Sequence, residues 1–225
     1  MVVVAHADDA EFTVAGTVAK WVNEGKEVTY LIVTDCSRGT DDPNFLPAEL
    51  SKVRKKEQRA AADRLGVKEV VYLDYQDGTV QHTLDLRRDI VRKIRKHRPH
   101  IVITMDPTRR WVGQGYINHP DHVATSDATL AAVFPAARDY WNFHELIGEG
   151  LMPHKVAEVY IYASEDADVW IDIGDTIEDK IAALKEHRSQ VGDSDVGEGM
   201  RNWARDIAKD KDMEYAEAFK YFKLG

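Results

Sequence analysis

The chain has 225 residues, of which 44% are hydrophobic and 31% are charged, with only 7 proline and 14 glycine residues. This composition excludes a disordered, collagen-like or low-complexity protein and fits one folded domain, with or without an appendage. The 30 Lys and Arg residues against 39 Asp and Glu residues give a formal net charge of −9. An acidic chain repels the phosphate backbone of nucleic acids, so we expect no nucleic-acid partner.

The sequence also limits the expected location and the expected metal ligands. No segment approaches the run of about 18 apolar residues that a membrane span needs, and residues 1–5 lack the basic region and apolar core of a signal peptide. We therefore expect a cytoplasmic protein without a membrane span. Cys36 is the single cysteine, which excludes an internal disulfide and a cysteine-rich zinc module. Any metal must be held by histidines and carboxylates.

Strands alternate with helices along the first half of the chain. Apolar β-branched runs predict strands, and apolar residues at helical spacing predict the helices between them. The predicted strands are residues 1–5, 28–33, 69–73 and 100–104, and the predicted helices are residues 11–24, 47–65 and 84–97. Such alternation is typical of an α/β fold with a mostly parallel sheet and helices on both faces.

The second half of the chain is less regular. In order, it predicts a loop, a helix, two strands and a helix, at residues 105–118, 120–134, 156–162, 169–173 and 176–189. Residues 193–199 are rich in Gly and Asp and predict a loop, and the charged segment 200–222 with its spaced aromatic residues predicts a helix packed on the body. The sequence shows no repeat and no linker. The prediction is one domain, 1–225, with a helical appendage at 193–225.

One imidazole and three carboxylates follow the first predicted strand. His6, Asp8, Asp9 and Glu11 stand at a strand end, where open α/β sheets bind their ligands. One carboxylate there is explained by capping of the next helix. Capping gives no reason for His6 or for two adjacent aspartates, which repel each other unless a cation lies beside them. The segment is therefore a candidate metal or catalytic site.

A second cluster, His119-Pro120-Asp121-His122, follows the fourth predicted strand. Proline is favoured in the first turn of a helix, and residues three apart share a helix face, so both histidine rings are expected in one crevice. Asp121 is near enough to accept a hydrogen bond from an imidazole and fix its tautomer. With the first cluster, this gives the two histidines and one carboxylate of a hydrolytic zinc site. Spacing alone does not decide which aspartate is a ligand and which a base.

The two clusters resemble the motifs of the LmbE-like or PIG-L-like zinc-dependent N-deacetylases, which remove acetyl groups from N-acetylglucosaminyl substrates. The family pattern AHPDDxE stands here as residues 5–11, with Ala7 in place of the proline, and the pattern HPDH stands unchanged as residues 119–122. Weaker matches run through most of the chain, at Thr34-Asp35, Arg54 to Ala61, Leu65-Gly66, Asp77-Gly78, Asp106-Pro107 and His187 to Gln190. The resemblance implies a Rossmann-like fold and a looser turn at Ala7.

The resemblance also implies catalytic roles. The metal ligands would be His6, Asp9 and His122, the metal would be zinc or another divalent ion, and Asp8 would be the general base. Water activated by the metal would attack the amide, and His119, protonated and held by Asp121, would stabilise the oxyanion and protonate the departing amine. The reverse assignment, with His119 as ligand and His122 as acid, stays open because both rings share one helical turn.

Three further residues are candidates for binding the substrate by resemblance. Arg54 would reach sugar hydroxyls or an anionic group, although an ion pair with Glu57, one helical turn away, explains it equally well. Asp77 would accept from a sugar hydroxyl, although Gln76-Asp77-Gly78 is an ordinary turn. His187 would serve its own site or that of a neighbouring subunit, although its helical spacing also suits a packing histidine.

The resulting prediction is a metal-dependent hydrolase that removes the acetyl group from an N-acetylglucosamine-type sugar or conjugate. Its partner would be a small amino-sugar substrate, and the resemblance allows a homo-oligomer, a trimer or hexamer. One alternative is an amidase acting on a non-sugar or thiol-conjugate amide. Another is a non-catalytic nucleotide-binding module, which is disfavoured because the first strand is not followed by G-x-G-x-x-G.

Overall fold

Seven strands form one sheet in the structure, a computed structural model that describes residues 1–224. The strands are β1 (Val2–Val4), β2 (Thr29–Thr34), β3 (Glu69–Tyr75), β4 (Ile101–Met105), β7 (Glu158–Tyr162), β8 (Val169–Asp172) and β9 (Ala216–Lys223). Their order in the sheet is β3-β2-β1-β4-β7-β9-β8. Among them only β9 runs against the others, where it pairs with β7 and β8. The predicted mostly parallel α/β fold in a single domain is confirmed.

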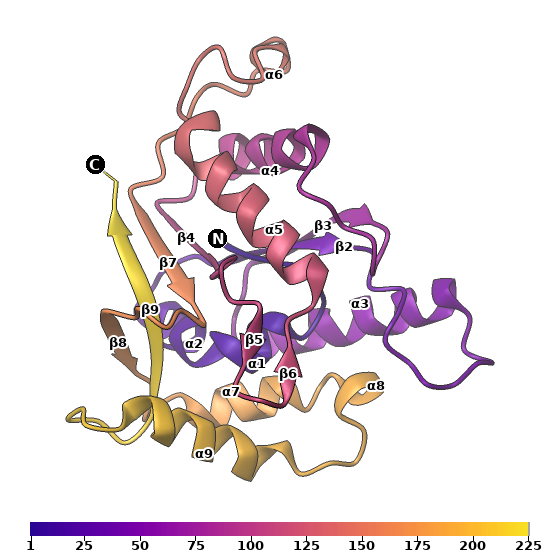
Figure 1. Ribbon diagram of the computed structural model, residues 1–225, viewed down its shortest axis with the longest axis vertical. Helices are drawn as coiled ribbons and strands as arrows, with labels where there is room; N and C mark the ends of the chain where they lie inside the picture. Colours follow the sequence, from indigo (N-terminus) through magenta and orange to yellow (C-terminus); the bar gives the residue numbers. More distant parts are fainter. Residues whose placement is uncertain (225) are drawn as a thin grey trace.

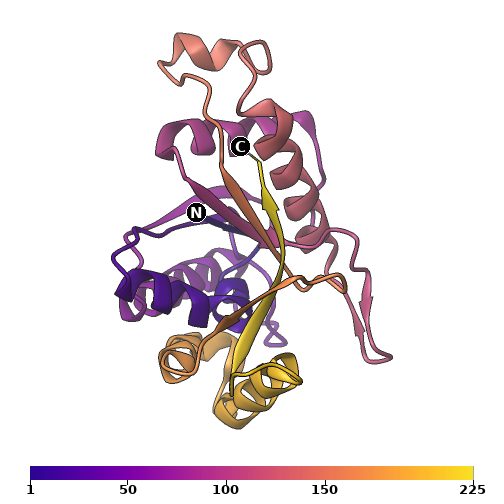
Figure 2. The same cartoon turned by 90° about the vertical axis from the view of Figure 1, so that its left-hand side faces the viewer.

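Helices cover both faces of the sheet (Figures 1 and 2). The layer on one face contains α1 (Asp9–Thr13), α2 (Ala15–Asn23) and α3 (Pro47–Arg64), and the layer on the other contains α4 (Leu84–His97) and α5 (Pro120–Ala131). The remaining helices are α6 (Glu145–Gly148), α7 (Ile177–Leu184), α8 (Arg188–Val191) and α9 (Val196–Ala208), and a short hairpin is formed by β5 (Trp111–Val112) and β6 (Tyr116–Ile117). Figure 2 shows the sheet edge-on between the two layers.

The three valines of β1 lie at the centre of this arrangement. Val2 and Val4 pack into the core with α1, α2 and α3, and Val3 packs into the opposite core with α4 and α5. A strand buried on both faces needs apolar residues at every position, which the run Val2–Val4 supplies. Chain connections leave in opposite directions from β1 and β4, so a crevice opens beyond the carboxyl ends of these strands, where ligands bind in this class of fold.

The helix predicted at 11–24 is two helices, and a distant carboxylate explains the break. The helical path is interrupted at Val14, with φ −123°, between α1 and α2. The N–H groups of Gly16 and Thr17 donate to Glu217 of β9, over 3.0 and 2.8 Å. These are the first N–H groups of α2, which have no partner inside the helix. Glu217 therefore caps α2 from the other end of the chain.

The segment 193–225, predicted as a helical appendage, contains a helix in its first part and a strand in its last part. The predicted loop at 193–199 already contains the start of α9, because the Asp195 side chain accepts from the N–H of Gly197 as an N-cap. Residues 216–223 are not a helix but β9, between β7 and β8. The period-2 alternation of Phe219, Lys220 and Tyr221 suits a strand better than a helix. The segment completes the sheet and is part of the single domain.

Two other predicted helices are shorter than expected. The helix predicted at 120–134 ends at Ala131 and passes into one wide π turn over Ala132–Ala136, where Pro135 cannot continue the α-helical hydrogen bonds. The helix predicted at 176–189 divides into α7 and α8. Within residues 1–224, no helix combines the length and the apolar character that a membrane crossing requires.

Candidate metal centre

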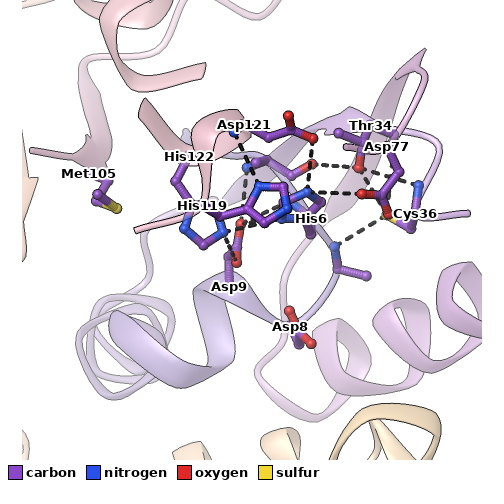
Figure 3. A network of polar contacts seen from close by, with 12 residues as sticks. His6, Asp8, Asp9, Thr34, Cys36, Asp77, Met105, His119, Asp121 and His122 are labelled. Carbon is purple, nitrogen blue, oxygen red and sulfur yellow. Dashed lines mark hydrogen bonds and ion pairs between the residues drawn. The ribbon is translucent and has the colours of Figure 1, made fainter. Parts of the chain in front are cut away.

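Both predicted motifs lie at one cavity beyond the carboxyl ends of β1 and β4 (Figure 3). The loop after β1 supplies the first motif, and the start of α5 supplies the second. The cavity has a volume of ≈ 540 Å³, and among the described residues it is lined by His6, Asp8, Asp9, Phe12, Thr13, Met105, Arg109, Tyr116, Asn118, His119, His122, Tyr162, Ala163 and Trp203. The topology thus brings together residues that are more than a hundred positions apart in the sequence.

His6, Asp9 and His122 form one group of converging donor atoms. His122 Nε2 lies 3.0 Å from Asp9 Oδ1 and 3.2 Å from His6 Nδ1. The ligand atoms of the three residues all lie within 4.8 Å of one another. Two imidazole nitrogens and one carboxylate oxygen are the donor set of many hydrolytic zinc sites, which leave a further position open.

Hydrogen bonds behind the two rings determine which nitrogen faces the group. His6 Nε2 lies 3.3 Å from carboxylate oxygens of both Asp77 and Asp121, and His122 Nδ1 lies 3.0 Å from Asn118 Oδ1. These outer nitrogens are therefore the N–H donors, which turns the lone pairs of His6 Nδ1 and His122 Nε2 toward Asp9. Outer acceptors of this kind fix the tautomer and orientation of metal-binding histidines.

The electrostatics of the group favour a cation. Burial alone lowers the pKa of His6, but the hydrogen bonds to Asp121 and Asp77 and the charge of Asp9 outweigh it and raise the pKa to about 10. A proton on His6 also relieves the contact between two nitrogen lone pairs. Because the same nitrogens are aimed at Asp9, a divalent metal can take the place of that proton.

The two carboxylate oxygens of Asp9 have different partners. Its Oδ2 accepts from the backbone N–H groups of Ala5 and His6, over 3.1 and 2.8 Å, which leaves Oδ1 for His122. Burial alone raises the pKa of Asp9, but the neighbouring His122 and His6 outweigh burial and lower it. The carboxylate is thus ionised and fixed at the end of β1.

Asp8 lies at the edge of the cavity, and its backbone is strained. Its φ is +90°, in the left-handed region that residues other than glycine rarely adopt. The conformation is held by Gln58, whose Oε1 accepts from the Asp8 N–H over 3.0 Å, and by Arg54, whose Nη2 lies 3.6 Å from the Asp8 carboxylate. Burial and the negative charge of Asp9 raise the pKa of Asp8 to about 7. A carboxyl with this pKa exchanges protons readily near neutrality.

The structure corrects the predicted pairing of Asp121 with His119. The Asp121 carboxylate accepts from the backbone N–H groups of Gly78 and Val80, over 2.7 and 3.0 Å, and contacts His6. Only its backbone N–H reaches His119, whose Nδ1 accepts over 3.2 Å as the N-cap of α5. Burial and the charge of His6 lower the pKa of His119, so a resting protonated ring is disfavoured. Asp121, fully buried, positions His6.

A second group of donor atoms consists of His6, His119 and Asp121. It corresponds to the open alternative in which His119 is a ligand. In this group, however, both Asp121 oxygens already accept backbone hydrogen bonds, and His119 Nδ1 already caps α5. The geometry therefore favours the first group.

The three predicted substrate-binding residues lie behind the cavity wall. Arg54, Asp77 and His187 are 4%, 3% and 0% exposed. Arg54 donates to the carbonyl oxygens of Ala7 and Arg38, and Asp77 contacts His6. These contacts support the motif loops, and the role of the three residues in substrate binding stays a prediction.

His187 belongs to a buried chain of contacts that ends at Asp8. His187 Nε2 lies 3.2 Å from Glu11 Oε2, and the Gln58 amide donates to the other Glu11 oxygen over 2.9 Å. Gln58 in turn accepts from the Asp8 N–H. The Glu11 of the first motif thus helps to hold Asp8 in its strained conformation.

Ala7, which replaces the proline of the motif, makes a hydrogen bond that proline could not make. Alanine keeps a backbone N–H that proline lacks, and this N–H donates to Cys36 Sγ over 3.3 Å. Cys36 is fully buried, and burial raises the pKa of its thiol to about 11. A neutral buried thiol suits this supporting role and not that of a nucleophile. The turn that the sequence predicts to be looser is therefore held by another contact.

Sequence reasoning missed most of the cavity wall. Asn118 directly precedes the second motif, and its four-residue separation from His122 was an available signal. Aromatic residues at the wall, including Tyr116 and Trp203, carry no motif that marks them as functional. Trp203 lies in the segment expected to be an appendage.

Comparisons with known proteins point to one family of enzymes. Residues 1–133 match the PIG-L family model, described as GlcNAc-PI de-N-acetylase. The chain is 36% identical over 220 residues to the diacetylchitobiose deacetylase of Thermococcus kodakarensis, covering 96% of this chain and 80% of the relative. It is 28% identical over 240 residues to the 1D-myo-inositol 2-acetamido-2-deoxy-alpha-D-glucopyranoside deacetylase of Mycobacteroides abscessus, covering 89% and 84% of the two chains.

A solved structure gives the same result. The N,N'-diacetylchitobiose deacetylase from Pyrococcus horikoshii, in complex with its inhibitor MPG, superimposes with a TM-score of 0.91 at 28% identity, and the match covers 99% of this chain and 82% of that one. The family model spans both motifs, and the structural match extends over α9 and β9. The chain belongs to the PIG-L family of de-N-acetylases.

Proposed function

We propose that this protein is a zinc-dependent N-deacetylase that acts on N-acetylglucosamine-type sugars or their conjugates. The observation that carries the proposal is the orientation of His6 and His122. Each ring donates its outer N–H to an acceptor and turns its inner nitrogen toward Asp9. The relatives named as deacetylases of acetamido sugars support the substrate class.

Residues of the chain supply the remaining chemistry. Zinc bound by His6, Asp9 and His122 would lower the pKa of water to about 7 and polarise the amide carbonyl. Asp8 accepts the proton of the attacking water, since its carboxyl borders the cavity beside the proposed ligand Asp9. Asp8 then returns the proton to the departing amine, because an amide nitrogen leaves only when it is protonated.

His119 acts as a neutral hydrogen-bond donor in this proposal. Its Nδ1 accepts from the Asp121 N–H, so the ring proton of the neutral imidazole is on Nε2. A donor of this kind at the cavity wall stabilises the negative charge that develops on the carbonyl oxygen. The role needs no protonated ring, which agrees with the lowered pKa of His119.

The test combines metal analysis with acetate release. The purified protein should contain zinc and release acetate from N-acetylglucosamine, diacetylchitobiose or an N-acetylglucosaminyl malate conjugate. His122→Ala should lose the zinc, whereas His100→Ala, an exposed histidine paired with Glu158, should keep it. Asp8→Asn should keep zinc and lose turnover, and Asp127→Asn, an exposed aspartate, should keep both.

Two results would contradict the proposal. Full zinc occupancy in His122→Ala would remove the assigned ligand set. Cleavage of non-sugar or thiol-conjugate amides together with inactivity on acetamido sugars would favour the amidase alternative. The cytoplasmic location and the trimer or hexamer stay predictions.

A further inference from the structure

The catalytic cavity has two chemically different kinds of wall. One consists of the charged and imidazole side chains of the metal centre, and the other contains the aromatic residues Phe12, Tyr116, Tyr162 and Trp203. A volume of ≈ 540 Å³ lies in the range of pockets that enclose a drug-sized molecule. The reacting acetamido group and its own sugar ring leave part of such a cavity free.

Trp203 is a cavity-wall residue that the core of the fold leaves largely exposed. Its neighbours on α9, Met200 and Ala204, pack into the small core with Ile181 and Tyr215. Trp203 lies at the edge of that core, remains 42% exposed and borders the cavity. Figure 1 shows α9 beside α7 at the foot of the molecule, so the C-terminal part of the chain supplies Trp203 to the wall.

The Trp203 ring is held in place before any ligand arrives. Lys180 Nζ lies 5.7 Å from the centre of the ring, a cation–π contact. The ammonium group is itself fixed, because it donates to Glu217 over 2.6 Å and to the carbonyl oxygen of Thr13 over 2.9 Å. A ring held in advance loses little conformational entropy when a ligand stacks on it.

We propose that Trp203 stacks on the ring attached to the reacting amino sugar and so selects substrates with a second pyranose at that position. The inference rests on the proposed deacetylase function. The C–H face of a pyranose is apolar and weakly positive, and it complements the negative face of an indole. Trp203 lies beyond residues 1–133, the part that the family model matches.

Charge favours a neutral sugar over an acidic group at this position. The chain carries a net charge of −9. This overall charge repels a dicarboxylate more than an uncharged pyranose. An acidic conjugate held by Arg109, the cation of the cavity wall, is the competing outcome that the experiment must separate.

The experiment measures kcat/KM for acetate release by the zinc-loaded protein with three substrates: diacetylchitobiose, N-acetylglucosamine and an N-acetylglucosaminyl malate conjugate. The variants are Trp203→Ala, Trp203→Phe and, as a matched control, Trp141→Ala, whose ring is 75% exposed in the segment before α6. Trp203→Ala should lower kcat/KM for the disaccharide about tenfold, the order expected for loss of one stacked ring.

The same variant should leave the monosaccharide within about twofold of the wild type, which also shows that the variant is folded. Trp203→Phe should retain most of the disaccharide rate, and Trp141→Ala should change neither. Two results would overturn the inference and leave the proposed function intact. One is an unchanged disaccharide rate in Trp203→Ala, and the other is a wild-type preference for the malate conjugate that Trp203→Ala retains. Failure of the wild type to release acetate from all three substrates would overturn the proposed function, and the inference with it.

Discussion

The buried pair Lys180–Glu217 should contribute strongly to stability, and its contribution should be cooperative. Lys180 Nζ and Glu217 Oε1 are 2.6 Å apart, and the two side chains are 4% and 3% exposed. Glu217 also accepts from the first N–H groups of α2, and Lys180 donates to the last turn of α1. The pair therefore connects β9 and α7 to the helices that follow the first motif.

Glu217→Ala leaves the buried Lys180 ammonium without its carboxylate partner and two backbone N–H groups without their acceptor. Breaking a buried pair in this way costs about 3–5 kcal/mol, a large part of the roughly 5–15 kcal/mol that stabilises a typical domain. Lys180→Met should cost less, about 1–3 kcal/mol, because Glu217 keeps its two N–H donors. The free energy of unfolding of the double variant should be about 2 kcal/mol higher than the sum of the two single-variant losses predicts, since the double variant contains no unpaired buried charge.

The assay is urea unfolding of the four proteins at a fixed zinc concentration, followed by far-UV circular dichroism. Lys220→Met serves as the control, because its partner Asp168 is exposed and such pairs contribute about 0–1 kcal/mol. A coupling free energy below about 0.5 kcal/mol between the two sites would refute the reasoning. It would mean that water or a rearranged side chain replaces the lost partner.

Three further predictions follow from individual contacts. Asn118→Leu should lower zinc affinity about 10–100-fold, because His122 loses the acceptor that orients it; a zinc titration unchanged from the wild type would contradict this role. His119→Ala should lower kcat by about 10²–10³ with little change in KM or zinc content, and loss of zinc would instead identify His119 as a ligand. Arg95→Met should speed proteolysis within residues 137–157 without altering kcat, because the buried guanidinium donates to carbonyl oxygens between Ala136 and Phe143. Equal cleavage rates in the variant and the wild type would refute this prediction.

The parts of the site that the sequence predicted are those encoded by short-range patterns. The strand ends predicted that the side chains of His6, Asp9 and His122 lie in one crevice, because parallel strands end at the same edge of a sheet. Their assignment as ligands relied on the family resemblance and awaits the metal analysis. The α4 helix was predicted with both ends correct, since Thr83 caps its start and Pro99 follows its end.

Features that depend on distant parts of the chain were not predictable in this way. The start of α2 after Val14 is capped by Glu217, about two hundred residues away, so the residues near position 14 do not by themselves predict the cap. Asp121 was assigned to the wrong imidazole because spacing within a helix favours His119, whereas the fold brings His6 to its carboxylate. The burial of Arg54 and Asp77 was not predictable, because nothing in the local sequence distinguishes these charged residues from exposed ones.

The position of β9 in the sheet has a consequence for the order of folding. β8 is made about forty residues before β9, yet among the described strands its partner is β9, which separates it from β7. During synthesis the edge of β7 and the whole of β8 therefore stay unpaired until the last strand leaves the ribosome. Since Glu217 arrives with that strand, the α1–α2 junction that follows the first motif also lacks its cap until then. We expect nascent chains that stop before residue 216 to aggregate through these open edges and to bind zinc poorly.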